Sequence, residues 1–428
     1  MKIWRSLCLG LAMLACAQSA YAEGYSLSEW SARGLGLAGG MVGRADDPSA
    51  IAYNAAGITQ LEGTQMMVGG AFVAPMGAVS SDTGKGVHYT QTKVQTWVNG
   101  HGYFTHQLND NVWLGMGVFS RFGVGVNYGG DWVGRYNMYD VGLQTVSAVP
   151  TVAYKVNDWL SLSLGVEFLY AHLYEGVKAN SIKPYDSTYD IDAQVEGQGI
   201  AGGVNLGALV KFNDQWSLGL AYKSQMTLNM AGDVDFGNTA STIRAVGAVG
   251  GSQMAAATKN KLRNSDLDGT VQLPDSLAVG LTYRPREDLS FEVGTVWTRW
   301  STYDHLNIYV DKPYGDAMKS RKDFNDGWNF NASVEWKALD WLTLRGGAYY
   351  ETSVVSENHS DYMIPSSGRT GINFGAGFHW NDFTLDMAYV HMFVNPLDYD
   401  NSVEKGTHPG QTEDCVTNIY SMSLTYKF

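Results

Sequence analysis

The chain ends in Tyr420-Ser-Met-Ser-Leu-Thr-Tyr-Lys-Phe428, a stretch with a large apolar side chain at every second position. Because successive side chains of a β-strand point to opposite faces, these apolar residues share one face of a strand, and small or polar residues occupy the other. An apolar outer face, a polar inner face and a terminal aromatic residue are typical of the last strand of an outer-membrane barrel. The sequence therefore predicts an all-β fold, a transmembrane antiparallel β-barrel. We expect the barrel assembly machinery to recognise Phe428.

The amino terminus predicts export. Lys2 and Arg5 precede the apolar stretch 7–17, and Ala20-Tyr21-Ala22 has the small-x-small pattern that signal peptidase cleaves. We therefore expect residues 1–22 to be a signal peptide that is cleaved after Ala22. A barrel with this leader belongs in the outer membrane of a Gram-negative bacterium.

Composition supports a barrel and excludes several other classes. The 428 residues include 50 Gly, 25 Tyr and 13 Trp, a mixture that suits bent strands and aromatic belts at membrane interfaces. Of three cysteines only Cys415 lies beyond the signal peptide, so a disulfide within the mature chain is not possible. No later stretch has the roughly 18 apolar residues of a transmembrane helix. A net charge of −13 argues against nucleic acid as a partner.

Short polar turns divide the second part of the chain into hairpins. Each turn separates two segments of alternating polarity, and tryptophan stands beside most of them, where an indole suits the membrane–water interface. Both termini are expected in the periplasm, so about six short turns indicate about seven hairpins and about fourteen strands. The turns are 109–111, 157–158, 213–214, 285–288, 339–340 and 381–382, and the adjacent tryptophans are Trp113, Trp159, Trp216, Trp341 and Trp380.

The alternation also predicts which face of each strand meets the outer-membrane lipid. Apolar residues occupy every second position of 160–170 and of 328–336, and Ser, Gly, Asn and Glu stand between them. The connections opposite the short turns are long and polar, as extracellular loops are. The longest, 224–272, contains the small and mildly apolar stretch 245–257, which is either a hydrophobic entry groove or a flexible loop.

Residues 23–63 do not follow the hairpin pattern. They are rich in small residues, carry few charges and contain an Asp-Pro turn at 47–48. A segment of about forty residues is long enough to occlude a barrel of about fourteen strands, whose lumen would otherwise be open to water. We therefore predict a hatch, residues 23–63, inside the lumen of a barrel formed by residues 64–428. The alternative is a disordered periplasmic tail, which the apolar composition disfavours.

A series of short strings follows this plan along the mature chain. In their order, with the hatch before the barrel, they resemble the FadL-type family of outer-membrane transporters of long-chain fatty acids and hydrocarbons (OmpP1/FadL/TodX-like). The strings are Ser31-Ala-Arg-Gly-Leu-Gly36, Ala45-Asp-Asp-Pro48, Asp131-Trp-Val-Gly-Arg-Tyr136, Pro150-Thr-Val-Ala-Tyr-Lys-Val-Asn-Asp158, Leu273-Pro-Asp-Ser-Leu277, Leu344-Arg-Gly-Gly347 and Ile364-Pro-Ser-Ser-Gly-Arg369.

The resemblance implies a monomeric fourteen-stranded barrel with an amino-terminal hatch. It also implies capture of a hydrophobic small molecule between extracellular loops and passive release through a lateral opening in the wall. A long-chain fatty acid is the expected ligand, with an aromatic or aliphatic hydrocarbon as the alternative. The chain departs from the family at Asn54-Ala55-Ala56-Gly57, where the family's hatch usually has Asn-Pro-Ala, so the fixed φ of proline is missing from this part of the hatch.

The chemistry of a fatty acid points to candidate ligand-binding residues. Each buried methylene contributes roughly 0.8 kcal/mol, and one cation is needed to orient the carboxylate. Arg345 faces inward in a predicted strand and either orients the ligand or pairs with Glu335 or Glu167. Arg135 and Arg369, at loop edges, are further candidates. Apolar residues including Phe122 and Val124 alternate with Gly123 and Gly125, which indicates a bent strand near a wall opening.

Other functional classes have less support in the sequence. No Gly-x-Ser-x-Gly motif is present, and the histidines are scattered without catalytic or metal-ligand spacing, so we expect no enzyme activity, cofactor or metal site. A general diffusion porin would not need a hatch. A structural or adhesin barrel is the remaining alternative.

Overall fold

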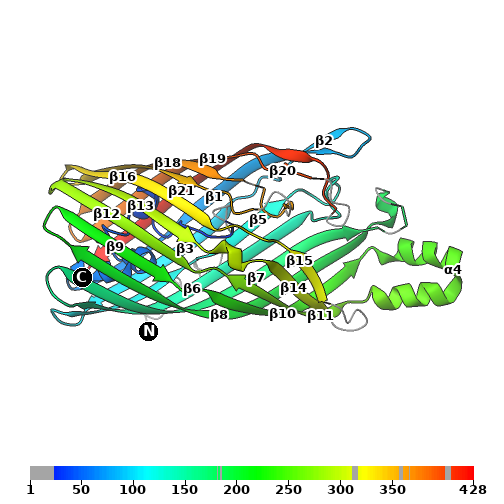
Figure 1. Ribbon diagram of the computed structural model, residues 1–428, viewed down its shortest axis with the longest axis horizontal. Helices are drawn as coiled ribbons and strands as arrows, with labels where there is room; N and C mark the ends of the chain where they lie inside the picture. Colours follow the sequence, from blue (N-terminus) through cyan, green and yellow to red (C-terminus); the bar gives the residue numbers. More distant parts are fainter. Residues whose placement is uncertain are drawn as a thin grey trace.

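The computed structural model describes residues 24–180, 182–183, 186–310, 317–355, 360–365, 367–400 and 406–428. The predicted signal peptide, residues 1–22, and the expected first mature residue, Glu23, lie outside this part of the chain. The described residues form an elongated closed barrel (Figure 1). No described helix is both long and apolar enough to span a membrane.

The wall of the barrel contains fourteen antiparallel strands among the described residues, which confirms the strand number expected from the turns. Each strand pairs with the next, and β21 pairs with both β19 and β1, which closes the ring. The strands are β1 (Thr64–Asp82), β3 (Trp97–Gln107), β4 (Val112–Phe119), β6 (Asp140–Lys155), β7 (Leu160–Ala179), β8 (Ile191–Lys211), β9 (Trp216–Lys223), β12 (Ser276–Arg286), β13 (Leu289–Thr298), β16 (Gly327–Leu339), β17 (Leu342–Glu351), β18 (Arg369–Trp380), β19 (Phe383–Val394) and β21 (Gly410–Lys427).

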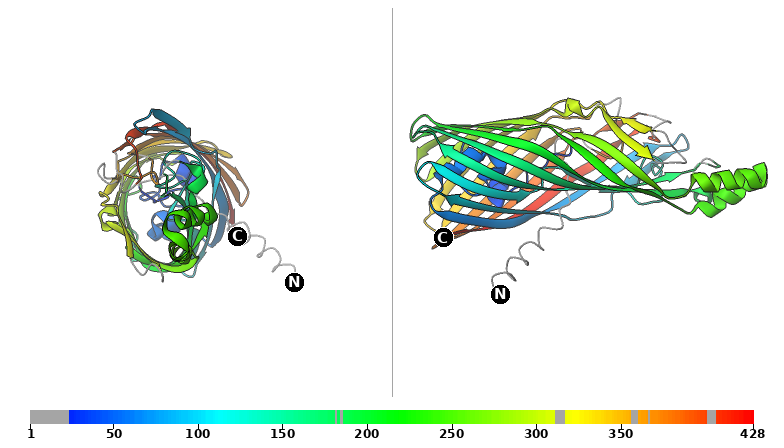
Figure 2. Two further views of the ribbon diagram at one scale, coloured as in Figure 1. Left: turned by 90° about the vertical axis from the view of Figure 1, so that its right-hand side faces the viewer. Right: turned by 90° about the horizontal axis from the view of Figure 1, so that it is seen from below.

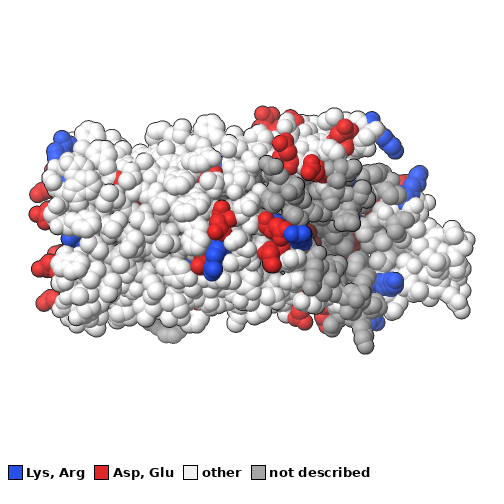
Figure 3. Space-filling view, in the orientation of Figure 1, with Lys and Arg blue, Asp and Glu red and all other residues white. Residues whose placement is uncertain are grey.

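The outer surface of the wall is apolar, as the alternation predicts. Leu164, Phe168 and Phe330 are about half exposed, whereas Ser163 and Glu167, which alternate with them, are buried on the lumen side. Charged side chains gather at the left rim and from the middle of the visible face toward the right, and the band between them is almost free of charge (Figure 3). Such a band is the surface that a bilayer covers.

The short turns and the carboxy terminus share one end of the barrel (Figures 1 and 2), the periplasmic end of an outer-membrane protein. Trp159 and Trp341 are 55% and 53% exposed beside their turns, as expected for interfacial indoles. The same prediction was wrong for Trp113. Its strand position points inward, and its Nε1 donates a hydrogen bond of 2.6 Å to the Leu61 carbonyl inside the barrel.

The opposite, extracellular end carries strand extensions and short helices. The segment 224–272, which we expected to be a loop, is mostly regular: β10 and β11 continue the wall, and α4 projects beyond it (Figure 1). The helix bends at Gly251, where φ is 77°. The elements at this end are β2 (Val87–Gln91), β5 (Gly123–Asn127), η2 (Ser187–Tyr189), β10 (Met226–Gly237), α4 (Thr239–Lys261), β11 (Ser265–Leu273), η3 (Trp300–Thr302), β14 (His305–Val310), β15 (Ala317–Arg321) and β20 (Asp398–Tyr399).

Residues 24–61 of the hatch lie inside the barrel (Figure 2) and are almost entirely buried. They form α2 (Ala32–Gly36), α3 (Ala50–Tyr53) and η1 (Ala55–Gln60). The Ser31 hydroxyl accepts from the Gly34 N–H and caps α2. These short helices cannot bury their small apolar residues on their own, so the wall supplies the remaining packing surface.

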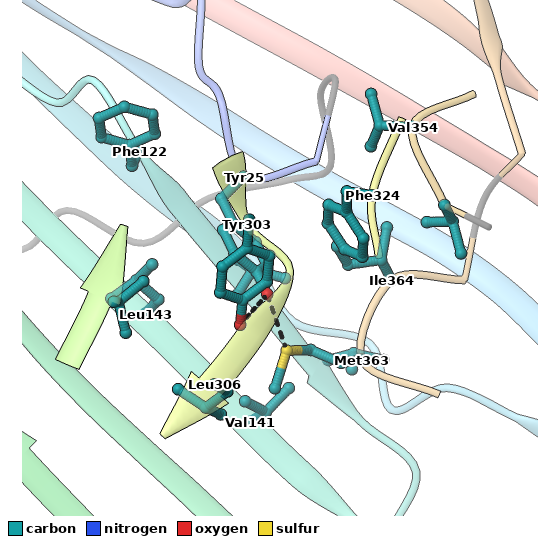
Figure 4. Packing of buried hydrophobic residues seen from close by; sticks show 14 of the residues in the cluster. Tyr25, Phe122, Val141, Leu143, Tyr303, Leu306, Phe324, Val354, Met363 and Ile364 are labelled. Carbon is teal, nitrogen blue, oxygen red and sulfur yellow. Dashed lines mark hydrogen bonds between the residues drawn. The ribbon is translucent and has the colours of Figure 1, made fainter. Parts of the chain in front are cut away.

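A cluster of apolar residues from the hatch, the wall and the loops fills the extracellular half of the lumen. In this extracellular cluster the Tyr25 hydroxyl of the hatch donates to the Tyr303 hydroxyl at 3.0 Å and also lies 3.4 Å from the Met363 sulfur (Figure 4). Phe122 and Phe324 belong to the same cluster. The space left for a ligand therefore lies below this cluster, between the hatch and the wall.

Candidate functional site

An apolar cavity of about 110 Å³ separates the hatch from the barrel wall. The hatch contributes residues from the segment before α2, from α2 and α3 and from the chain between them. The wall contributes inward-facing positions of β9, β12, β13, β16, β17, β18 and β21. Its apolar lining includes Leu35, Ala38, Val42 and Tyr53 from the hatch and Ala221, Ala278, Val296, Tyr349 and Ile419 from the wall.

A buried cation, Lys223, faces this cavity. Lys223, the last residue of β9, is only 7% exposed, and its ammonium nitrogen lies 3.5 Å from the centre of a ring of Trp30. Among the residues that the structure describes, no acceptor forms a hydrogen bond with this ammonium and no carboxylate forms an ion pair with it. The Phe119 ring lies 5.6 Å from the same nitrogen. A buried ammonium held only by aromatic faces lacks the anion that such a group normally requires.

Arg121 also lines the cavity but is already bonded. Its guanidinium lies 3.3 Å from the Glu167 carboxylate and donates to the carbonyls of Ser224 and Pro274. Arg121 and Glu167 are therefore paired with each other, and Lys223 is left without a carboxylate partner among the described residues.

The structure places Arg345 elsewhere, beside a polar chamber of about 530 Å³ at the periplasmic end. Its guanidinium contacts the Glu335 carboxylate at 2.6 Å and the Asp386 carboxylate at 2.7 Å. The sequence left two roles open for Arg345, a ligand contact or an ion pair with Glu335 or Glu167, and the structure shows the pair with Glu335. Glu335 also accepts two hydrogen bonds from Arg33 of the hatch, so this network joins the hatch to the wall. A ligand role for Arg345 stays a prediction.

The other predicted site residues lie nearer the extracellular end. Arg135 contacts Asp190 at 2.7 Å among the loops, and Arg369, the first residue of β18, lies 3.7 Å from Glu351. Phe122 and Val124 are both about 1% exposed and pack in the extracellular cluster rather than against the apolar cavity. The structure therefore does not bring these residues and Arg345 together at one site.

The hatch string that departs from the family pattern forms its turn without proline. The Asn54 side chain accepts a hydrogen bond from the Ala56 N–H and donates to the carbonyls of Val42 and Ala208. Ala55 begins η1, a position where no N–H partner is needed and where proline is tolerated but not required. At Gly57 any Cβ would overlap the backbone of Ala45, so glycine is needed there.

The hatch is fixed to the wall by groups at its middle. Three consecutive backbone N–H groups, those of Val42, Gly43 and Arg44, donate to the Glu292 carboxylate of β13 at 2.8 to 3.2 Å. Hydrogen bonds between buried donors and a carboxylate are strong because water does not compete for them. The hatch is therefore bonded to the wall as well as packed against it.

Glu29 is a buried titratable group of the hatch. It is 3% exposed and accepts hydrogen bonds from the Ser28 N–H at 3.2 Å and from the Asn99 amide at 3.5 Å. Burial raises the pKa of its carboxyl from 4.5 to about 7, and the nearby Glu351 carboxylate adds to the rise, while backbone hydrogen bonds oppose it. The folded state therefore binds a proton at Glu29 that the unfolded chain releases.

We expect Glu29→Gln to change how stability depends on pH. The folded-state pKa is raised, so the wild type loses stability as pH rises from about 4.5 through 7, on the order of 3 kcal/mol in all. The neutral amide lacks this cost, so the variant should be more stable than the wild type at pH 8.5 and equal to it near pH 4. Thermal unfolding of the detergent-solubilised barrel at both values measures this, and an equal difference at both would contradict it.

The alternation of β9 also points to Lys223, although we selected Arg345 as the candidate cation from the sequence. In β9 the inward positions are Ser217, Gly219, Ala221 and Lys223, so the alternation that indicated Arg345 applies equally to Lys223. Whether each cation is free to bind a ligand depends on its partners in the folded protein, and those partners come from segments that are distant in the sequence. Among the described residues no group of three His, Cys, Asp or Glu side chains is arranged to hold a metal ion.

Comparison with known proteins gives one family. Residues 13–428 match the family model described as outer membrane protein transport protein (OMPP1/FadL/TodX). Outer membrane protein P1 of Haemophilus influenzae is 24% identical over 487 residues, covering 100% of both chains. The long-chain fatty acid transport protein of Escherichia coli K12 is 23% identical over 415 residues, covering 90% of this chain and 91% of the other.

Solved structures show the same fold at lower identity. A Pseudomonas aeruginosa FadL homologue superimposes with a TM-score of 0.83 at 18% identity, covering 94% of this chain and 99% of that one. The Pseudomonas putida toluene transporter TodX gives 0.68 at 15% identity, covering 94% and 99%. At these identities the likeness establishes the architecture, and the ligand must be inferred from the residues of the cavity.

Proposed function

The chain belongs to the OMPP1/FadL/TodX family of outer membrane transport proteins, and we propose that it takes up long-chain fatty acids by passive diffusion. The observation that carries the proposal is the Lys223 ammonium, which no described carboxylate pairs, at the wall of an apolar cavity. A carboxylate with a hydrocarbon chain satisfies both features at once, because its head supplies the missing anion and its methylenes fill the apolar space.

A second candidate ligand follows from the size of the cavity. About 110 Å³ is somewhat less than the roughly 150 Å³ of a protein cavity that binds benzene, so this space matches one aromatic ring better than a long acyl chain. A long acyl chain requires the hatch side chains around Leu35 and Val42 to move apart. Uptake of a neutral aromatic hydrocarbon is therefore the alternative within the family, and it leaves Lys223 unused.

The contacts of the hatch support release through the wall rather than through the periplasmic mouth. Below the hatch lies the chamber lined by Arg33, Asp47, Glu335 and Arg345, where a hydrocarbon chain would displace water from charged groups. Arg33 and the Glu292 contacts also hold the hatch to the wall at this end. Lateral release into the bilayer avoids both obstacles.

We further propose that the protein works as a monomer, since one chain contains the barrel, the hatch and the cavity. Assembly is proposed to depend on β21, which ends the ring: Tyr426 pairs in register with Met66 of β1 and with Phe383 of β19. Phe428 follows this pairing at the periplasmic end and is the proposed contact for the assembly machinery.

Uptake measurements distinguish the proposed function from its alternatives. Cells that lack their own fatty-acid transporter and express this chain should take up radiolabelled palmitate in a saturable way, and excess unlabelled palmitate should compete while a small sugar should not. Competition by toluene but not by palmitate would assign the protein to hydrocarbon uptake. Sugar permeation without palmitate uptake would identify a porin and contradict the proposal.

A further inference from the structure

The hydrogen-bonded wall is interrupted between β3 and the strand pair β4–β5. Pairs between β3 and β4 run from Gln107↔Trp113 only to Gly102↔Val118, although β3 continues beside β1 as far as Trp97. Beyond the bend at 120–122, β5 pairs with β6 on one side. We call the gap between residues 97–101 of β3 and residues 119–125 of β4–β5 the wall seam.

The first described residues of the hatch replace β3 along this seam. Ser26 forms an antiparallel bridge with Phe122, the Leu27 N–H donates to the Arg121 carbonyl at 2.9 Å, and the Gly123 N–H donates to the Tyr25 carbonyl at 2.7 Å. These bonds satisfy backbone groups of the bend that would otherwise face a dry interior. The seam is thus closed by a segment of the hatch and not by a neighbouring strand of the wall.

The Trp97 side chain fills the seam from the lumen side. Its ring lies against Gly125 so closely that a Cβ on that glycine would come within 2.5 Å of the indole. The indole is 5% exposed, and its Nε1 is buried without a hydrogen-bond partner among the described residues. Buried indole N–H groups usually find an acceptor, so this ring is held in place by packing alone.

On its inner side, Trp97 packs in the same cluster as residues that line the apolar cavity. Leu35, Ala38, Tyr349 and Ile419 belong both to that cluster and to the cavity lining. The indole therefore lies in the layer of side chains that backs the apolar cavity on this side.

A second, smaller cavity of about 30 Å³ lies beside Gly125, the residue against which the indole packs. Its lining includes Gly125 of the seam and passes from the inward-facing Val79 and Thr417 to Met76. Met76 is 45% exposed and continues the lipid-facing row of β1. This seam cavity therefore has lining residues on both faces of the wall. Trp97 connects the two linings, because its ring packs against Gly125 of the seam cavity and it belongs to the same cluster as Leu35 and Ile419 of the apolar cavity.

We propose that Trp97 is the gate between the apolar cavity and the seam cavity, and that displacement of its indole lets the hydrocarbon end of the ligand enter the wall. The inference rests on the proposed lateral release and adds the residue that controls it. An indole without a hydrogen bond moves with less cost than one that must break such a bond, and glycine at position 125 leaves room for the ring in the closed state.

Two variants act on the same ring in different ways. Trp97→Ala removes the indole, whereas Gly125→Ala retains it but forces it away from the seam. The matched control is Gly346→Ala on the lipid-facing side of β17, where the nearest atoms are 3.9 Å from the new Cβ. Trp97→Phe keeps an aromatic ring in the seam and should behave nearly as the wild type does.

Release of a preloaded fluorescent fatty acid into acceptor vesicles measures the gate directly. Trp97→Ala and Gly125→Ala should each raise the release rate about fivefold or more, and Gly346→Ala should leave it unchanged. Heat-modifiability of each purified variant establishes that its barrel is folded. Wild-type release rates in both seam variants would overturn the proposal, even if fatty acid binds as expected.

Modification of Cys415 gives a readout that does not depend on the ligand. Cys415 lines the seam cavity and is the free cysteine of the described residues. Its reaction with N-ethylmaleimide should be severalfold faster in Trp97→Ala than in the wild type or in Gly346→Ala. If palmitate does not bind at all, the proposed function fails while this rate still tests the gate, and an unchanged rate would show that the indole does not close the seam.

Discussion

Deleting residues 24–61 while keeping the signal peptide should convert the protein into an open pore. Apart from the wall seam, where hatch residues bond the bend at 121–123, the wall closes through pairs of its own strands, so a barrel of fourteen strands should still assemble. Its lumen is then wide enough for a continuous column of water. We expect the conductance in planar bilayers to rise at least about tenfold above that of the intact chain.

The wall residues that lose their hatch partners explain why the deletion should be tolerated. Glu292, Asn373 and Ser423 each bond the backbone of the hatch in the intact protein. In an open lumen water replaces those donors and acceptors, so these groups do not become buried and unsatisfied. A folded, heat-modifiable deletion variant with the conductance of the intact chain would contradict an occluding role for the hatch.

A point substitution offers a milder form of the same experiment. Gly57→Val places a side chain where the backbone of Ala45 lies, and should loosen the hatch without removing it. We expect occasional openings in the bilayer recording rather than a permanently open state. Ala55→Pro is the control, because η1 begins at that residue and accepts proline in its first position.

The sequence predicted the barrel well because the polarity pattern within each strand is enough to identify that strand. Alternation in 160–170 and 328–336 is a local pattern, and the bilayer outside and the polar lumen inside both enforce it. The number of strands followed from turns that are equally local. For Trp113 a local pattern was misleading, because its proximity to a turn suggested an interfacial position. Trp113 stands at an inward-facing position of its strand, where the Leu61 carbonyl of the hatch accepts the hydrogen bond of its indole.

The ligand site was less predictable because it depends on which distant residues meet. Parity directs both Lys223 and Arg345 into the lumen, and nothing local distinguishes them. Arg345 meets Glu335 and Asp386 from neighbouring strands, whereas Lys223 meets the Trp30 ring of the hatch. The glycines around Phe122 and Val124 did indicate a bent strand. The hatch residues that close the seam beside that strand come from about a hundred positions earlier in the sequence and have no local signal.

Lys223→Met should weaken binding of palmitate selectively. Methionine retains much of the apolar stem that packs beside Trp30 but removes the ammonium, so only a ligand with a carboxylate loses a partner. A charge-assisted hydrogen bond contributes about 1.5–3 kcal/mol, which corresponds to roughly a 10- to 100-fold loss of affinity. Hexadecane, which has the same chain length and no charge, should bind to the variant and to the wild type with affinities within about twofold.

Arg345→Met is the matched comparison, because that guanidinium is bonded to Glu335 and Asp386 and lies beside the periplasmic chamber rather than the apolar cavity. Removing it leaves those carboxylates without a partner, so we expect a less stable hatch with little change in palmitate affinity relative to hexadecane. Isothermal titration of both ligands against both variants measures the difference. Selective loss of palmitate in Arg345→Met and not in Lys223→Met would move the head-group site to the periplasmic chamber. Equal weakening of both ligands in Lys223→Met would show that Lys223 supports the wall and does not bind the head group.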